Sequence, residues 1–311
     1  MLCHRVCIAL GIAVLSFVGF VGSAAADRPR LIEKRDSVYN SIFVHERDGL
    51  HIMSFGVNNK YFTESKYDPS NDRALPVVYT RYMTAALTYV PKADNLAEIG
   101  FGGGRTAAYL HLHMPQTEIT AVEIDKAVLD LAQAHFGIVP DERLKLVARD
   151  GRLFLKRTKE SFDVILIDAY RGSFVPFHLL TQEFFETVEA RLNEGGVAVQ
   201  NIEPSTMLYD RALITLRAVF DHVDVYPARG NIVAIAYNGP PRSQASLLAR
   251  AETLQAEHDF YYPLGDLLAD RRIVTTLPEG RPLTDDFAPV ETLNAIERHN
   301  LAIDRYSEPA R

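Results

Sequence analysis

Apolar and polar positions alternate in two different ways along this chain, and the change of pattern divides it into segments. Residues 37–63 alternate apolar and polar side chains on either side of Asp48-Gly49. Alternation about an Asp-Gly pair predicts two antiparallel strands joined by a tight turn. We therefore expect a small β-hairpin unit early in the chain, followed by a polar loop and a helix from about Leu75 to Tyr89.

From Asn95 onward, short apolar runs alternate with segments of helical spacing. The runs predict seven strands, at 95–99, 118–123, 144–148, 162–167, 195–201, 221–227 and 231–237. Helices are expected at 104–113, 126–136, 151–157, 181–192 and 206–219, and after Pro240 at 243–258 and 261–272. Strands alternating with helices predict an α/β fold with a seven-stranded, mainly parallel sheet covered on both faces.

The first 26 residues form a segment of their own. Val6 to Ala26 carry no charge, Arg5 precedes them and three alanines end the run, which is typical of a cleavable secretory signal. The length of the run is also close to the roughly 20 residues that span a bilayer. The arginines and lysines that follow it favour a membrane anchor whose following chain faces the cytoplasm. We therefore expect a chain that is exported or anchored through residues 6–26, with the side of the membrane left open.

The remaining domain boundaries follow from the same patterns. We predict a small N-terminal β unit at 27–72, a nucleoside-binding α/β domain at 73–240 and a C-terminal helical extension at 241–311.

Composition and charge exclude some classes of partner. The chain has 47% hydrophobic and 23% charged residues, as ordinary globular proteins do. Its formal charge is -7, and because Arg5 is the one charged residue of 1–26, the rest carries -8. This balance disfavours nucleic acid as a partner. Both cysteines, Cys3 and Cys7, lie in the first segment, and no metal-ligand spacing occurs, so we expect no metal.

The run LAEIGFGGGRT, residues 96–106, is the strongest candidate for a ligand-binding turn. It places Glu98 two residues before Gly100, with Gly102 and Gly104 following between a predicted strand and helix. Glycines allow a backbone to approach a ligand closely, although such turns can also serve helix–strand packing alone. The spacing E-x-G-x-G-x-G is not that of a pyrophosphate cradle, and the carboxylate suits a cationic or hydroxylated ligand.

Polar residues also follow the next predicted strands. Ligands of parallel sheets bind at the carboxyl ends of strands, and a carboxylate one βαβ unit after the glycine turn can reach ribose hydroxyls. The residues in these positions are Glu123 and Asp125, Asp150-Gly151, Asp168-Ala169-Tyr170, and Gln200-Asn201. The glycine turn and the acids after the next three strands therefore stand at four successive strand ends. Packing alone hardly explains such a series.

The motifs E-I-G-x-G-G-G, V-E-I-D and D-G, with an acid after the fourth strand, resemble those of the spermidine synthase family of aminopropyltransferases. This family shares the class I methyltransferase fold, which is Rossmann-like, and the resemblance covers roughly residues 37–238. Two further segments resemble most closely those of the bacterial spermidine-synthase-like proteins, namely DAYRGSFVPFHLLTQEFF and LTDDFAPVE. The resemblance implies transfer of the aminopropyl group of decarboxylated S-adenosylmethionine to a small-molecule amine, in polyamine biosynthesis.

The resemblance also implies roles for individual residues. Asp168 would act on the attacking amine, and Glu123 would hold the ribose. Asp150 and Gly151 would hold the adenine, while Gly100 to Gly104 would form the floor under the sulfur. The acceptor would meet Tyr39, Tyr79 and Gln200. Tyr170 follows the acid by two positions, so we expect it to line the wall of the substrate pocket.

Two departures from the family pattern concern the acceptor. Arg81 and Arg171 stand where the family has acids that hold the distal ammonium of a diamine. A cationic acceptor would meet repulsion of about 1 kcal/mol or more for each close pair of charges. We therefore expect an amine other than putrescine.

Two alternatives stay open at this point. A methyltransferase on the same fold would use S-adenosylmethionine itself, and a catalytically silent nucleoside-binding domain is consistent with the two arginines and with export. The sequence also leaves open whether the chain forms a homo-oligomer.

Overall fold

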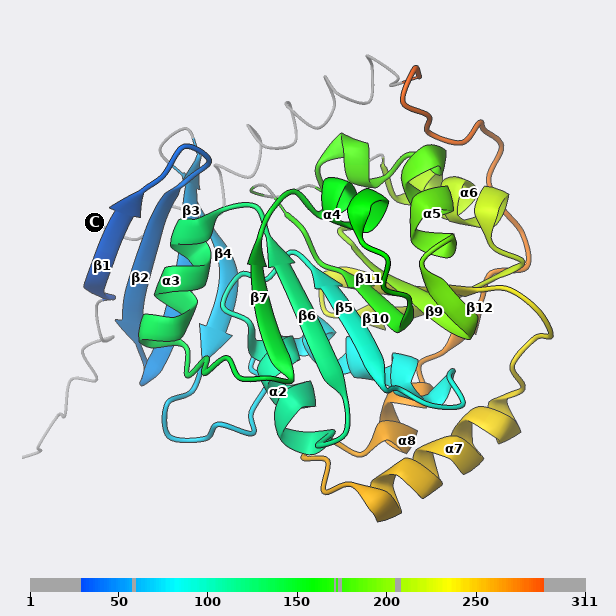
Figure 1. Ribbon diagram of the computed structural model, residues 1–311, viewed down its shortest axis with the longest axis horizontal. Coiled ribbons are helices and arrows are strands. Elements are labelled where there is room, and N and C mark those ends of the chain that lie inside the picture. Colours follow the sequence, from blue (N-terminus) through cyan, green and yellow to red (C-terminus); the bar gives the residue numbers. More distant parts are fainter. Residues whose placement is uncertain (1–28, 58–59, 171, 173–174, 205–207, 288–311) are drawn as a thin grey trace, which may run out of the picture.

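The computed structural model describes residues 29–57, 60–170, 172, 175–204 and 208–287, which form two sheets with helices around the larger one (Figure 1). The predicted signal or anchor at 1–26 lies outside these residues. Within the described ranges, no helix combines the length and the apolar character that a membrane crossing requires.

The smaller sheet has the strand order β1-β2-β3-β4, all antiparallel. Its strands are β1 (Arg30–Asp36), β2 (Ser41–Arg47), β3 (Leu50–Val57) and β4 (Lys60–Tyr67). The expected hairpin is β2–β3, and its turn residues Asp48 and Gly49 have φ angles of 52° and 76°, as a two-residue hairpin turn requires. The unit is larger than predicted because the flanking strands β1 and β4 are too rich in charged residues to alternate clearly.

The larger sheet has the order β12-β10-β11-β9-β8-β5-β6-β7. Its strands are β5 (Asn95–Ile99), β6 (Glu118–Glu123), β7 (Leu144–Ala148), β8 (Phe162–Ile167), β9 (Leu192–Ile202), β10 (His222–Ala228), β11 (Asn231–Tyr237) and β12 (Arg272–Ile273). Pairings among β5 to β9 are parallel, and the others are antiparallel. The fold prediction is confirmed, with one correction: the sheet has an eighth strand, β12, whose two residues are too few to show a pattern.

Helices cover both faces of this sheet. One hydrophobic cluster joins residues such as Leu96 and Val164 to α1 (Val78–Met83), the 3₁₀ helix η1 (Thr84–Thr88), α2 (Arg105–His113), α3 (Lys126–His135), α7 (Gln244–Glu257) and α8 (Leu264–Leu268). The other joins their neighbours Ala97 and Ile165 to α4 (Gly151–Arg157), α5 (Gln182–Glu189) and α6 (Leu208–Val219), with η2 (Phe177–Leu179). Successive strand residues thus face opposite cores.

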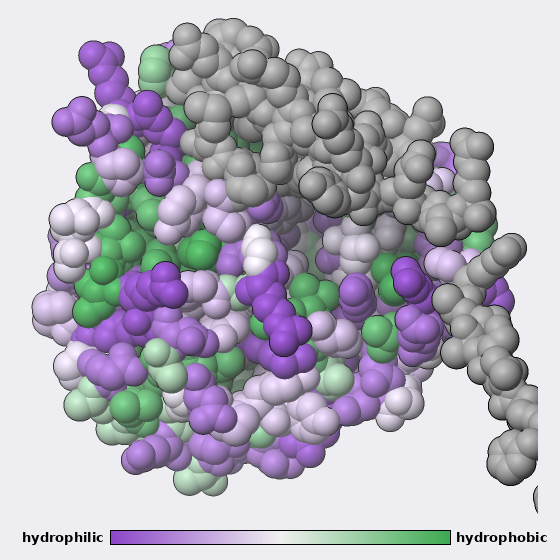
Figure 2. All heavy atoms as spheres, turned by 180° about the vertical axis from the view of Figure 1, so that it is seen from behind, coloured by the Kyte–Doolittle hydropathy of each residue, from purple (hydrophilic) through white to green (hydrophobic). Residues whose placement is uncertain are grey.

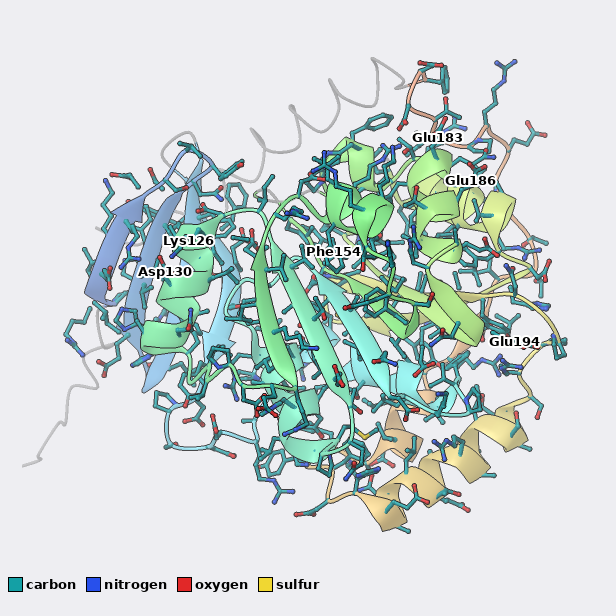
Figure 3. All side chains as sticks on the ribbon, viewed as in Figure 1. Lys126, Asp130, Phe154, Glu183, Glu186 and Glu194 are labelled. Carbon is teal, nitrogen blue, oxygen red and sulfur yellow. The ribbon has the colours of Figure 1, made fainter. Side chains whose placement is uncertain are left out.

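The smaller sheet is attached to the larger one through α3 (Figure 1). His135, at the end of α3, lies 2.7 Å from Glu33 of β1, and its carbonyl oxygen lies 2.6 Å from Nδ1 of His51 in β3. On the outer surface of the same helix, Lys126 and Asp130 are paired at 2.7 Å (Figure 3). The helix therefore places the N-terminal sheet beside the edge where the parallel strands end.

The C-terminal part returns to the larger sheet in two places. The helix expected at 261–272 is shorter, because α8 ends at Leu268 and Arg271 reaches back to the buried Asp224 of β10. Farther on, Asp285 accepts hydrogen bonds from Arg152 of α4 at 2.5 and 2.7 Å. Asp285 therefore holds this C-terminal segment against α4.

The face of the molecule in Figure 2 shows hydrophilic and hydrophobic residues interspersed.

Candidate active site

A cavity of about 660 Å³ lies at the carboxyl ends of the parallel strands. The chain builds β6 and β7 on one side of β5 and then places β8 on the other, so the strand order reverses at this point. Open α/β sheets bind ligands at such a reversal, and the volume suits a small molecule. Residues from β4 and from the loop after β1 complete the wall, so both sheets form the site.

Asp168 lies at the base of this cavity, immediately after β8. Its Oδ2 accepts a hydrogen bond from the hydroxyl of Tyr79 at 3.0 Å, and its Oδ1 accepts one from Nδ2 of Asn201 at 2.8 Å. Burial raises the pKa of Asp168 to about 7, although both hydrogen bonds act in the opposite direction. Burial and the charge of Asp168 also raise the pKa of Tyr79, which keeps its proton and donates it. The site thus holds a carboxylate poised to exchange a proton near neutral pH.

Asn201 lines the cavity, whereas the sequence prediction named its neighbour Gln200. Gln200 is buried and lies off the cavity wall, where its amide donates to the carbonyl of Asn201 at 2.8 Å. Because β9 continues to Ile202, Asn201 still follows the strand alternation and faces the cavity. Asn231 donates to Oδ1 of Asn201 at 3.0 Å, which leaves the Nδ2 of Asn201 to donate to Asp168. Tyr170 lines the cavity wall, and its hydroxyl donates a hydrogen bond to the backbone carbonyl of Asn201.

The glycine turn forms the floor between β5 and α2. Gly100 and Gly102 line the cavity, and both have positive φ. A Cβ at Gly100 would lie 2.5 Å from the backbone of Ala169, so this glycine lets the turn pass close to the strand end that carries Asp168. Gly104 lies off the wall. It has a φ of 68°, and a Cβ there would lie 2.2 Å from the ring of Phe101, so its role is to shape the turn.

Glu123 and Asp150 line the side of the cavity toward β6 and β7. The Glu123 carboxylate accepts the backbone N–H groups of Phe101 and Asp125, each at 3.0 Å. Burial raises its pKa, and these backbone bonds oppose the rise. A carboxylate oxygen has further lone pairs, so Glu123 can still accept from ribose hydroxyls. Asp150 caps α4 through the N–H of Leu153 at 2.8 Å, and Gly151 follows it on the wall.

Asp125 does not line the cavity, contrary to the expectation for a cofactor-binding residue. It caps α3 through the N–H of Ala127 at 3.0 Å, and its other oxygen accepts from Ser37 at 2.5 Å and from Asn40 at 3.4 Å. These bonds hold the loop between β1 and β2 against the larger sheet. That loop carries Tyr39, which lies on the cavity wall as expected, with 46% of its surface exposed.

Glu98 also lies off the wall of the main cavity, because it sits within β5 and is only 2% exposed. It lines a second, much smaller cavity next to the first, together with Glu64 of β4. Glu64 lines both cavities and was missed by the sequence prediction. Nothing in the polar strand KYFTESKY singles it out, since only the packing of the two sheets brings it to the site.

Arg81, from which repulsion of a cationic acceptor was expected, contacts other parts of the protein. Its Nε donates to the carbonyl of Leu75 at 2.8 Å, and its guanidinium lies 4.3 Å from the centre of the Tyr262 ring. Arg81 is absent from the wall of both cavities. The other expected repulsive residue, Arg171, lies outside the described residues.

The side chains on the wall match the parts of a nucleoside that carries a sulfur arm. Glu123 suits ribose hydroxyls, Asp150 and Gly151 lie at the far strand end, and the glycine turn leads to Asp168. Across the described ranges, no group of three or more histidine, cysteine or acidic side chains is arranged to hold a metal ion.

Known proteins resemble this chain both in sequence and in fold. The family model described as the spermine/spermidine synthase domain matches residues 78–226. Residues 78–226 are therefore similar to that domain. The polyamine aminopropyltransferase of Vibrio vulnificus (strain CMCP6) is 29% identical over 277 residues, which cover 85% of this chain and 91% of that protein.

Solved structures extend the likeness to the fold. A probable spermidine synthase from Corynebacterium glutamicum superposes with a TM-score of 0.61 at 23% identity, covering 72% of this chain and 86% of that one. Human methyltransferase-like protein 13, in complex with SAH, gives a TM-score of 0.53 at 24% identity over 68% of this chain and 98% of that one. The chain thus has the fold of that probable spermidine synthase and of methyltransferase-like protein 13, and the predicted resemblance and fold are confirmed.

Proposed function

We propose that this chain is an aminopropyltransferase, which moves the aminopropyl group of decarboxylated S-adenosylmethionine to a primary amine in polyamine biosynthesis. The observation that carries the proposal is the position of Asp168, held between Tyr79 and Asn201 beside the glycine turn, with a pKa near 7. The family of the domain and the aminopropyltransferase of Vibrio vulnificus point to the same reaction.

The reaction needs a base because its acceptor is protonated at neutral pH. A primary alkyl amine has a pKa of about 10.4, as lysine does, so its lone pair is occupied by a proton. Asp168 accepts a proton from the amine and orients the lone pair. The nitrogen then attacks the methylene next to the sulfonium, the carbon–sulfur bond breaks, and its electron pair leaves the sulfur neutral as the thioether of 5′-methylthioadenosine. A base with a pKa close to the working pH contributes about 10²–10⁴ in rate.

The test is mass spectrometry of the products that the purified full chain forms from decarboxylated S-adenosylmethionine and a panel of amines. We expect an amine with one aminopropyl group added, and 5′-methylthioadenosine in equal amount. Asp168→Asn should remove at least about 99% of the rate, by the magnitude of base catalysis. Asp286→Asn, at an exposed position off the cavity wall, is the matched control. No transfer to any amine by the wild-type chain would end the proposal.

A methyltransferase is the second candidate, because the fold is also that of human methyltransferase-like protein 13. The two donors differ by one carboxylate, so titration calorimetry with each donor separates the two functions. Tight binding of S-adenosylmethionine alone would favour the methyltransferase.

We further propose that residues 1–26 take the chain to a membrane, either as a cleaved export signal or as an anchor. The uncharged run from Val6 to Ala26 and the three alanines that end it support this proposal. Cell fractionation with N-terminal sequencing tests it: a new terminus near Asp27 indicates export, an intact chain in the membrane fraction indicates an anchor, and an intact soluble chain contradicts both. Analytical ultracentrifugation of residues 27–311 would show whether a homo-oligomer forms.

A further inference from the structure

The C-terminal segment around Asp285 is docked onto the elements that border the active-site cavity. The backbone N–H of Gln182 donates to the carbonyl of Leu283 at 2.7 Å, and the N–H of Leu283 donates to the hydroxyl of Thr215 at 2.9 Å. The N–H of Asp285 donates at 3.0 Å to the carboxylate of Glu183, at the start of α5 (Figure 3). Leu283 is fully buried. This segment is therefore held both by its backbone and by a buried side chain.

Arg152 connects the segment to the wall of the cavity. Its guanidinium donates to Oδ1 of Asp285 at 2.7 Å and to Oδ2 at 2.5 Å, and such a bidentate pair fixes the orientation of the guanidinium. Nη1 of Arg152 also donates to the backbone carbonyl of His178 at 3.1 Å. Thr181, which is fully buried, donates its hydroxyl to Oδ1 of Asp285 at 2.8 Å. One carboxylate therefore holds both Arg152 and the residue that caps α5.

The two parts of the chain that Arg152 joins both line the main cavity. Asp150 lies on the wall two residues before Arg152, and the turn at 176–179, which includes η2, forms the adjoining part of the wall. Nε2 of His178 lies 3.1 Å from Oδ2 of Asp150, so the two parts also contact each other directly. Arg152 and Asp285 lie off the walls of both cavities. They therefore act on a ligand only through the residues on the wall.

The guanidinium of Arg152 depends on Asp285 for its orientation. Its Nε is buried and has no hydrogen-bond partner among the described residues. Only 10% of the Arg152 side chain is exposed, against 43% of the Asp285 side chain. The hydrogen bonds from Arg152 lower the pKa of Asp285, so the carboxylate stays ionised at neutral pH. The pair therefore persists under the conditions in which the protein works.

We propose that Asp285 is a positioning residue for the nucleoside of the donor. Asp285 holds Arg152, and Arg152 holds the carbonyl of His178, so the turn at 176–179 stays against Asp150. The inference rests on the proposed function, in which the donor nucleoside lies against this wall. Loss of the carboxylate frees the guanidinium and lets the turn move away. The nucleoside then binds more weakly, whereas the base at the end of β8 keeps its place.

Calorimetry and initial rates with the full chain test the proposal. The proteins are the wild type, Asp285→Asn, Arg152→Met and the double variant. Asp286→Asn is the matched control, because it removes the neighbouring exposed charge, off both cavity walls. The ligands are 5′-methylthioadenosine and decarboxylated S-adenosylmethionine, which share the nucleoside and differ in the aminopropyl arm. Initial rates give kcat and the KM of each substrate.

Asp285→Asn should weaken both ligands by the same factor, about three- to tenfold, as expected for loss of a partly exposed bidentate pair. The KM of the donor should rise by this factor, while kcat and the KM of the amine stay within twofold of the control. Arg152→Met should weaken binding at least as much. Asp285→Asn should add nothing to that loss in the double variant, because Asp285 acts through Arg152. A stoichiometry near one ligand per chain shows that affinity, and not the folded fraction, has fallen.

A purely stabilising role for Asp285 would give a different result. Asp285→Asn would then lower the melting temperature while its affinities matched those of Asp286→Asn, and this result overturns the proposal. So does an additive loss of affinity in the double variant, an equal rise in the KM of both substrates, or a wild type that does not bind 5′-methylthioadenosine. Absence of aminopropyl transfer would refute the proposed function alone, because binding of the nucleoside would still decide the role of Asp285.

Discussion

The phenol of Tyr79 donates a hydrogen bond to Oδ2 of Asp168 over 3.0 Å, and this contact joins the helix before β5 to the end of β8. Burial raises the pKa of Asp168 to about 7, and the bond from Tyr79 limits the rise because it stabilises the charged carboxylate. The pair therefore sets the pH at which the base becomes available.

A first prediction concerns the pH dependence of the wild type. Asp168 can accept a proton only when it is ionised, so kcat/KM for the acceptor should increase with pH through a pKa of about 7. The free acceptor keeps its own proton up to about pH 10, so its titration adds no step below pH 9. Initial rates from pH 5 to 9 measure the first step. A rate that is flat between pH 6 and 8 would contradict the role of Asp168 as the base.

Tyr79→Phe should move this step to higher pH. The variant loses a hydrogen bond to a charged group, and such bonds contribute about 1.5–3 kcal/mol, or on the order of one to two pH units. The same rate profile measures the displacement, and activity at pH 9 should recover toward that of the wild type. Tyr61→Phe, which changes an exposed tyrosine on β4, should leave the midpoint in place.

Asn201→Asp should impair the enzyme more than loss of a hydrogen bond would. Nδ2 of Asn201 lies 2.8 Å from Asp168, so the variant places a second carboxylate against the first. Two acids at this distance cannot both ionise near neutral pH, so the pKa of one rises strongly. We expect kcat/KM at pH 7 to fall about tenfold or more. Asn238→Asp, at a half-buried position away from both cavity walls, is the control, and a wild-type rate for Asn201→Asp would contradict the prediction.

Gly104→Ala should destabilise the fold more than Gly49→Ala. Both glycines have positive φ, at 68° and 76°, which costs an alanine about 1–2 kcal/mol. A Cβ at Gly104 would also lie 2.2 Å from the Phe101 ring, whereas a Cβ at Gly49 meets nothing within 4 Å. Overpacking adds about 1–3 kcal/mol to the loss in unfolding free energy. Urea unfolding of both variants measures the difference, and equal losses would show that Phe101 moves aside freely.

Arg271→Met should be strongly destabilising, although it lies far along the chain from the site. Arg271 donates to Oδ2 of the fully buried Asp224 at 2.6 and 2.8 Å, and Tyr89 donates to the same oxygen at 2.9 Å. Breaking one side of a buried pair typically costs about 3–5 kcal/mol of unfolding free energy. Urea unfolding tests this, with the exposed neighbour in Arg272→Met as control. Asp224→Asn added to Arg271→Met should recover part of the loss.

The sequence alone determined the α/β fold and most of the elements that build it. Strands such as 95–99, 118–123 and 162–167 were predicted at the residues where they occur, because each is a short apolar run bounded by turn residues. The glycine turn, Glu123, Asp150 and Asp168 were found for the same reason, since ligand-binding residues of parallel sheets follow strand ends along the chain. The boundaries predicted for the domains stay a prediction.

Only the tertiary structure decided which polar residues line the cavity. Gln200 and Asn201 are adjacent in sequence and differ in the face of β9 that they occupy. Glu98 lies off the wall of the main cavity and lines the second, smaller cavity. Asp125 fastens the loop that carries Tyr39. Glu64 reaches the site from another sheet. Such placements depend on packing between segments that are far apart in sequence. A local apolar pattern does not encode this packing, because it reports the periodicity of side chains along one element and not which other element lies against it.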